Sequence, residues 1–208
     1  ICNFGVSHCD GDYVVLLNND IEISSENWIE EMLAVAQLPG VGAVGGKLLY
    51  PDNKIQHAGI VIGIDGGARH PFKRFPANHR GFFLRLELLG NVSAVTGAML
   101  MVGRDRYLEV NGLDEDDFGV AYNDVDFCLK LLERGYRNVM VPRCAAIHHE
   151  SATRGYENSR EQQQRHEHEK HLLQEKWASL FYGGDPYYNP NLTLAREDYS
   201  LNFSKDSG

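Results

Sequence analysis

A strand that runs directly into a polar tip, residues 13–20 (YVVLLNND), constrains the fold of this chain most strongly. Its first five residues are apolar or aromatic without alternation, which is typical of a strand buried on both faces of a parallel sheet. The tip places Asp20 at the carboxyl end of the strand, where ligands bind in open α/β sheets. Asn and Asp also begin turns. The stretch therefore predicts a parallel sheet, and it leaves Asp20 either as a ligand for a metal or phosphate or as a turn residue.

Strands and helices alternate through the first half of the chain, which predicts an α/β sandwich with a largely parallel sheet. A long polar helix is expected over residues 157–177, with His166, His168 and His171 on a solvated face. An extended tail is expected beyond Tyr182. The other predicted strands lie at residues 41–50, 55–64, 91–102, 138–142 and 144–148, and the other predicted helices at about 24–37, 104–110 and 123–134, the last capped by Asn123.

The charge balance excludes one class of partner. A formal net charge of −9 argues against nucleic-acid binding, which needs a basic face to neutralise phosphates. An anionic substrate would then need a divalent cation or a local basic cluster. Residues 65–85 form a long predicted loop of the kind that is usually functional or disordered. It contains five basic residues: Arg69, Lys73, Arg74, Arg80 and Arg85.

The apolar runs, the cysteines and the first residue of the chain indicate its compartment and whether it is part of a longer protein. No apolar run approaches the ~18 residues that cross a bilayer, and no signal peptide opens the chain. Four scattered cysteines fit a reducing compartment. Because the chain begins at Ile1 without a methionine, we expect it to be a piece of a longer protein with other domains.

Three polar clusters are candidates for chemistry: residues 18–20 (NND), 123–126 (NDVD) and 148–150 (HHE). In the second cluster, carboxylates in the first turn of a helix stabilise its N-terminus, so Asp124 is either a helix-end or a catalytic residue. In the third, neighbouring residues on a strand face opposite ways, so only one of His148 and His149 can enter a given cleft. A carboxylate and an imidazole would suit Mn²⁺, or less readily Mg²⁺, with phosphate oxygens and water completing the shell.

The order of four segments, LLNND, TGAMLMV, GLDEDDFGVAYNDVDFCLKLLERGYRNVMVP and HHESATRG, resembles the family 2 glycosyltransferases of the GT-A fold. The likeness is strongest to the rhamnosyltransferase-like members that build bacterial surface polysaccharides. It implies a Rossmann-like three-layer α/β sandwich with a mostly parallel central sheet and a C-terminal helical extension. Residues 1–155 would be the catalytic portion, and 156–208 a helix and tail packed on it. The family's N-terminal nucleotide-binding half would precede Ile1.

The resemblance also assigns roles to metal and base residues. Residues 18–20 match the family's DxD-like motif, with Asp20 as the metal ligand and Asn18 in place of the first Asp. Asp124 matches the general base, and Asn123 stands where the family has Glu. The pair His148 and His149 matches the metal-binding histidine, with His149 slightly favoured.

Further residues are expected around the substrates. Asn18 and Asn19 are expected to border the bound donor or acceptor, and Thr96, Gly97 and Ala98 match the segment that lines their cleft. Asp117 lies in the loop that frames the acceptor, and Asn123 is also expected to contact the donor or acceptor.

The implied reaction is inverting sugar transfer in cell-surface polysaccharide synthesis. Asp124 would take a proton from an acceptor hydroxyl, and a Mn²⁺ or Mg²⁺ ion would neutralise the departing diphosphate. The donor would be a nucleotide-diphosphate sugar, and the acceptor an oligosaccharide or lipid-linked glycan. The enzyme would act in the cytoplasm or at the inner face of the cell membrane.

Two other functions compete with this interpretation. The scaffold could be a non-catalytic module that binds carbohydrate or a partner, but such a module needs no carboxylate at the helix start facing a cleft. It could also be a sugar nucleotidyltransferase, which would need a Gly-rich loop with Lys or Arg near its N-terminus. No such loop is present in this sequence.

Overall fold

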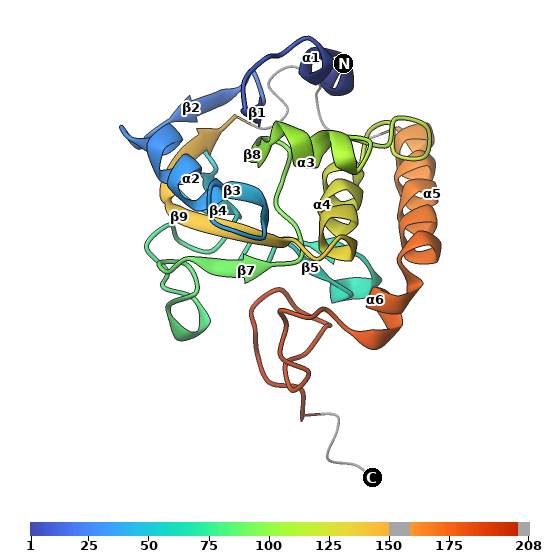
Figure 1. Cartoon of the computed structure of the whole chain (residues 1–208). Helices are drawn as coiled ribbons and strands as arrows, with labels where there is room; N and C mark the ends of the chain where they lie inside the picture. The colour runs from blue at the N-terminus through green and yellow to red at the C-terminus, as the bar shows by residue number, and fades with distance from the viewer. Residues whose placement is uncertain (150–158, 204–208) are drawn as a thin grey trace.

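The computed structural model describes residues 1–149 and 159–203, and within them a seven-stranded mixed sheet carries helices on both faces (Figure 1). Strands β5 (Val61–Ile62) and β6 (Ala68–Arg69) form a separate pair. The main sheet is ordered β1 (Tyr13–Leu17), β8 (Met99–Gly103), β3 (Val41–Leu49), β9 (Arg137–His148), β2 (Ile21–Ile23), with β4 (Ile55–His57) on β3 and β7 (Gly90–Val92) on β9.

The prediction of a mostly parallel sheet is wrong. Within the described ranges, β3 and β9 are the one parallel pair, and the other pairings of the sheet are antiparallel. Strand β1 itself runs antiparallel to β8 and stands at the end of the strand order. A continuous apolar run indicates that both faces of a strand are covered, but strand direction depends on the connections between strands. The run in β1 therefore could not distinguish the two arrangements.

The sheet and the helices on its two faces form three layers. Helix α2 (Trp28–Ala36) packs on one face, where Met32 and Val35 join the apolar side chains of β3 and β9. Helix α4 (Asn123–Glu133) packs on the other face through Val125, Phe127 and Leu129. The remaining α-helices are α1 (Cys2–Ser7), α3 (Arg104–Glu109), α5 (Arg160–Lys176) and α6 (Ala178–Gly183). Two 3₁₀ turns are η1 (Ile64–Gly66) and η2 (Phe82–Leu84). Helix α5 lies outside α4 (Figure 1).

Several predicted boundaries differ from the structure. The strand predicted over residues 91–102 divides into β7 and β8, while residues 138–148 form one strand, β9. Asn123 is not the cap of α4: the helix begins at Asn123, and Tyr122 precedes it with a left-handed φ of 62°. Glu150, the proposed boundary at 155/156 and the predicted helix start at 157 lie outside the described residues. Helix α5 is capped at Ser159 by a reciprocal capping box with Gln162.

The tail packs onto the middle of the chain. Tyr188, Leu192 and Tyr199 are buried in one apolar cluster with Phe72 and Leu86. The segment after α6 is thus an ordered cover over residues 55–86. In the part of the chain that the structure describes, no helix is both long and apolar enough to cross a membrane.

Candidate functional site

Asp20 and His148 meet at one edge of the main sheet. Asp20 follows the polar tip of β1, and His148 is the last residue of β9, opposite Ile21 of β2. The Oδ1 atom of Asp20 lies 3.1 Å from His148 Nε2, and the two side chains are only 15% and 12% exposed. Among the described residues, this buried Oδ1 has no hydrogen-bond partner. Since burying an unpaired carboxylate oxygen is costly, the site is suited to a cation.

The other ring nitrogen of His148 shows which atom faces Asp20. His148 Nδ1 lies 2.7 Å from Gln56 Oε1 on β4, and because that oxygen can only accept, Nδ1 carries the proton. In the neutral ring Nε2 then turns a lone pair toward Asp20 Oδ1, and the amide of Asn18 lies 3.4 Å from the same nitrogen. Two acceptor atoms that face each other repel unless a proton or cation lies between them. A partner on the far nitrogen is also how proteins orient metal-binding histidines.

His149 points to the other side of the strand. Its side chain is exposed, and its Nε2 lies 3.0 Å from Glu22 Oε2. Its backbone N–H donates to the carbonyl of Asp20 (3.0 Å). The sequence interpretation slightly favoured His149, whereas the structure places His148 beside Asp20. Within the described residues no three His, Cys, Asp or Glu side chains gather as a metal site, so a cation here would have two of these ligands and take others from a substrate and water.

Asp124 lies at the start of α4 and is held by a turn of the chain before β8. Its Oδ2 accepts the Gly97 N–H and its Oδ1 accepts its neighbour Val125 N–H, both at 2.8 Å. A Cβ at position 97 would lie 3.3 Å from Asp124 Cβ, so glycine allows this close approach. Burial raises the pKa of the Asp124 carboxyl, and these hydrogen bonds oppose the shift. A partly buried carboxylate with a raised pKa is suited to accept a proton.

The same turn, residues 96–98, connects Asp124 to the Asp20 and His148 pair. The Asn18 N–H donates to the carbonyl of Ala98 (3.0 Å), and the Thr96 N–H donates to Nε2 of His57 (3.3 Å). His57 follows Gln56 on β4, and Gln56 holds His148. The structure therefore brings together Asn18, Asp20, Thr96, Gly97, Ala98, Asp124 and His148.

Three other predicted site residues have different surroundings. Asn19 is exposed, and Asn123 is partly buried at the first position of α4. Asp117 is exposed, and its backbone N–H donates to Asp114 Oδ1 (3.0 Å). Because Asp114 Oδ2 contacts Lys176 at 2.9 Å, the loop of Asp117 is tied to α5.

A cavity of about 220 Å³ opens beside Asp124, with His70, Lys73, Tyr122 and His166 in its lining. His70 Nδ1 lies 2.8 Å from His57 Nδ1. Burial, with the charges of Lys73 and Arg69, lowers the pKa of His70 to about 3. Because Thr96 donates to His57 Nε2, His57 carries its proton on Nδ1 and donates it to His70, which leaves the His70 proton on Nε2. Nothing in the spacing of these two histidines predicted their contact.

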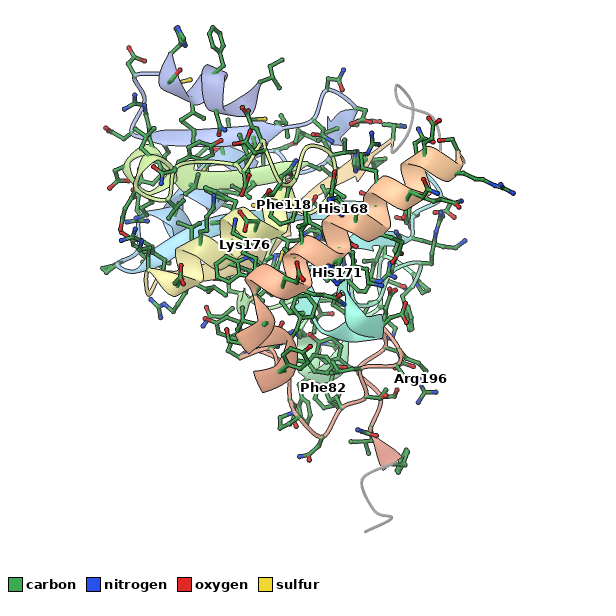
Figure 2. The ribbon with its side chains drawn as sticks, turned by 90° about the vertical axis from the view of Figure 1, so that its right-hand side faces the viewer. Phe82, Phe118, His168, His171, Lys176 and Arg196 are labelled. Carbon is green, nitrogen blue, oxygen red and sulfur yellow. The ribbon has the colours of Figure 1, made fainter. Side chains whose placement is uncertain are left out.

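Helix α5 braces the segment that leads into Asp124. Buried Glu169 accepts the Ala121 N–H (2.6 Å), and His166 Nε2 lies 3.1 Å from the Tyr122 hydroxyl. The predicted solvated face is thus confirmed for His168 and His171, which are exposed on α5 (Figure 2), and is wrong for His166. Helical periodicity could not reveal this because α5 is polar on nearly every side.

The sequence of the chain matches glycosyl transferase family group 2 over residues 46–168, more than half of its length. The chain belongs to this family. Among relatives of this glycosyltransferase chain, an uncharacterized protein of Sinorhizobium fredii is 45% identical over 96% of the chain, and the O-antigen biosynthesis protein RfbC of Myxococcus xanthus is 37% identical over all of it. The chain covers 22% and 16% of these two proteins, about a fifth of their length.

A more distant relative is the N-acetylglucosaminyl-diphospho-decaprenol L-rhamnosyltransferase of Mycobacterium tuberculosis, 27% identical over 69% of the chain and 49% of that protein. Two solved structures share the fold. The mannosyltransferase PcManGT of Pyrobaculum calidifontis, in complex with GDP-Man and Mn²⁺, has a TM-score of 0.50 at 17% identity, over 77% of this chain and 38% of that one. GalNAc-T7 with UDP, GalNAc and Mn²⁺ has a TM-score of 0.54 at 12% identity, over 91% and 45%. The chain therefore has the α/β fold of the GT-A glycosyltransferases, with a mixed sheet.

Proposed function

We propose that this chain is the metal-binding and base-bearing part of an inverting glycosyltransferase. Its donor would be a nucleotide-diphosphate sugar, and its acceptor an oligosaccharide or lipid-linked glycan of a cell-surface polysaccharide. One observation carries the proposal: the unpaired Asp20 Oδ1 faces His148 Nε2 at 3.1 Å, and the turn 96–98 joins this pair to Asp124. The names of the Myxococcus and Mycobacterium relatives support the substrate class.

Asp20 and His148 would hold a divalent cation, with Gln56 fixing the imidazole through Nδ1. The mixed nitrogen and oxygen donors favour Mn²⁺ over Mg²⁺. When bound, the ion supplies charge neutralisation for a departing diphosphate, which this acidic chain otherwise lacks. Both solved neighbours contain Mn²⁺, which supports the choice of metal.

Asp124 would act as the general base. Its carboxylate lines the 220 Å³ cavity, so an acceptor hydroxyl placed there can give up its proton as the oxygen attacks the anomeric carbon. The N–H groups of Gly97 and Val125 hold the carboxylate in one orientation. A module that only binds carbohydrate has no use for such a base, so the cavity beside Asp124 favours the enzyme.

We assign residues 1–155 to the catalytic portion and 156–208 to a helix and tail packed on it, supported by the contacts of α5 with residues 121 and 122. We attribute nucleoside recognition to other parts of a longer chain, since the relatives are about five times as long. We place the reaction in the cytoplasm at the inner face of the membrane, where a lipid-linked acceptor would lie.

Calorimetric titration of this chain with Mn²⁺ tests the metal site. Asp20→Asn and His148→Asn should each abolish measurable binding, because each removes one of two protein ligands. His149→Asn is the matched control and should bind Mn²⁺ as the unaltered chain does. Unchanged binding by Asp20→Asn, or equal loss in all three variants, would contradict the site.

A further inference from the structure

The segment before β7 exposes an unusual amount of apolar surface. Phe83 is 84% exposed, Leu88 55% and Leu89 61%, and the neighbouring Phe82 and Leu84 are also exposed. Among residues 82–89 only Leu86 is fully buried, in the cluster under the tail. Contiguous exposed apolar patches on soluble proteins generally mark sites of interaction. We call residues 82–89 the apolar tip.

Hydrogen bonds hold the apolar tip in a defined conformation. Arg80 and Glu87 close its base with two parallel hydrogen bonds, Nε to Oε1 at 2.8 Å and Nη2 to Oε2 at 3.1 Å. The Leu86 N–H also donates to the carbonyl of Arg80 (3.1 Å). Phe83 and Leu84 have φ values of 50° and 64°, a region that bulky residues avoid. With this backbone conformation Phe83 and Leu84 face solvent, although the nearby Leu86 is buried in the core.

The tail contacts the tip through Tyr199 and exposes apolar side chains of its own. The ring of Phe82 lies 6.1 Å from that of Tyr199, and the Arg85 guanidinium lies 5.4 Å over the Tyr199 ring. Leu201 and Phe203, which follow in the chain, are 52% and 74% exposed. Figure 1 shows the green segment before β7 projecting from the lower left, and Figure 2 places Phe82 at the lower end of the molecule beside the C-terminal segment.

The charge around the apolar tip differs in sign from that of the chain. Residues 65–90 contain five Arg and Lys residues and two carboxylates, whereas the whole chain has a net charge of −9. Arg80, which is bound to Glu87, and Arg74, which lies 3.9 Å from Asp52, keep more than half of their side-chain surface exposed. Projecting Phe and Leu side chains within this net-positive segment, here called the basic collar, match the interface of an anionic bilayer: apolar groups enter the acyl boundary, and basic groups stay at the head groups.

We propose that the apolar tip, with Leu201 and Phe203, docks this chain on the surface of an anionic lipid bilayer. The proposal rests on these side chains and is independent of the sugar-transfer reaction. The remaining acidic surface would face away from the lipid. Docking by a projecting tip predicts shallow, reversible binding that weakens with salt, because part of the attraction is between the collar and anionic head groups.

Flotation with vesicles of phosphatidylethanolamine and phosphatidylglycerol tests the proposal. The unaltered chain should float with the vesicles, and Phe83→Glu/Leu88→Glu should lower the partition coefficient at least about tenfold, since each change replaces an apolar side chain that would enter the bilayer with a carboxylate. The control Leu38→Glu/Leu108→Glu alters two leucines of similar exposure, 50% and 45%, away from the tip, and should float normally.

Three results would overturn the proposal: no flotation of the unaltered chain, equal loss in both double variants, or self-association sensitive to Phe83→Glu/Leu88→Glu without vesicle binding. The last would make the tip an interface between copies of the chain. Urea unfolding of each variant checks the fold, which substitutions at such exposed positions should leave intact. Mn²⁺ titration is a separate readout, so loss of vesicle binding with intact Mn²⁺ binding leaves the proposed enzyme site standing.

Discussion

Asp124 and Asp126 stand two residues apart in the first turn of α4. We predict that Asp126→Asn lowers stability and that Asp124→Asn lowers the rate of sugar transfer. The side chain of Asp126 is fully buried, and its Oδ1 accepts the indole N–H of Trp177 at 2.9 Å. The same oxygen lies 3.0 Å from Lys176 Nζ, and Oδ2 lies 3.4 Å from Lys130 Nζ. Asp126 therefore locks the end of α5 onto α4, whereas Asp124 faces a cavity.

The cost of Asp126→Asn follows from these contacts. In the variant, the hydrogen bond from the Trp177 indole ends on a neutral acceptor instead of a charged one, which lowers the unfolding free energy by about 1–1.5 kcal/mol. The Lys176 pair is worth about 1 kcal/mol, because that lysine is about a third exposed and solvent screens it. The new amide also places a donor 3.4 Å from the Lys130 ammonium, where the carboxylate oxygen Oδ2 had formed an ion pair. We expect unfolding free energy to fall by about 2–4 kcal/mol in total.

Asp124→Asn should be mild for stability and severe for transfer. Its charged hydrogen bonds to Gly97 and Val125 weaken, but the burial cost that raises its pKa disappears, so we expect a change of about 1 kcal/mol. Loss of the base should slow transfer by ~10²–10⁴-fold in the intact polypeptide.

Urea unfolding and Mn²⁺ titration of this chain, with transfer kinetics of the intact polypeptide, separate the two variants. Asp126→Asn should keep its Mn²⁺ affinity. The reasoning is refuted if Asp126→Asn costs under ~1 kcal/mol or if Asp124→Asn transfers at a near-normal rate.

Three further predictions concern the same site. Gln56→Ala should weaken Mn²⁺ binding about 10–100-fold by freeing the His148 ring, and an unchanged calorimetric affinity would show that Gln56 does not orient it. Because the pKa of Asp124 is raised, kcat/KM of the intact polypeptide should rise with pH through a value above the ordinary Asp pKa of about 3.9, and an acid limb at or below that value would argue against this base. The pKa of His70 is lowered to about 3 in the folded chain, so as pH falls below about 6.5 the unfolded chain binds a proton at His70 before the folded chain does. The free energy of unfolding should therefore decline from about pH 6.5 toward about pH 3. If the urea midpoint of His70→Gln has the same pH slope, His70 is excluded as the cause.

Local pattern was sufficient for several features of the fold. The apolar run of Tyr13–Leu17 forms a strand, and the stripe of Val125, Leu129 and their neighbours forms the buried face of α4. The long polar helix exists as α5. Each depends on interactions between residues a few positions apart, which the sequence displays directly. The order of the four motifs likewise indicated the family without any coordinates.

Strand direction was beyond the reach of local pattern. An apolar run has the same appearance in parallel and antiparallel sheets when both faces are covered, so β1 suggested a parallel sheet and instead pairs antiparallel with β8. The contact between His57 and His70 was also not predictable from local pattern. It depends on the course of the backbone between the two residues, which no pattern of residue types specifies.

The sequence by itself determined which residue types stand at the ends of the strands and helices: a carboxylate after β1, two in the first turn of α4, and two histidines at and after the end of β9. Only the tertiary structure decided among equivalent neighbours. It turned His148 to Asp20 and His149 to Glu22, and it left Asp124 at a cavity while burying Asp126 against Trp177. The physical reason is that a side chain's role depends on the partner it meets across the fold, and those partners lie more than fifty residues away in the chain.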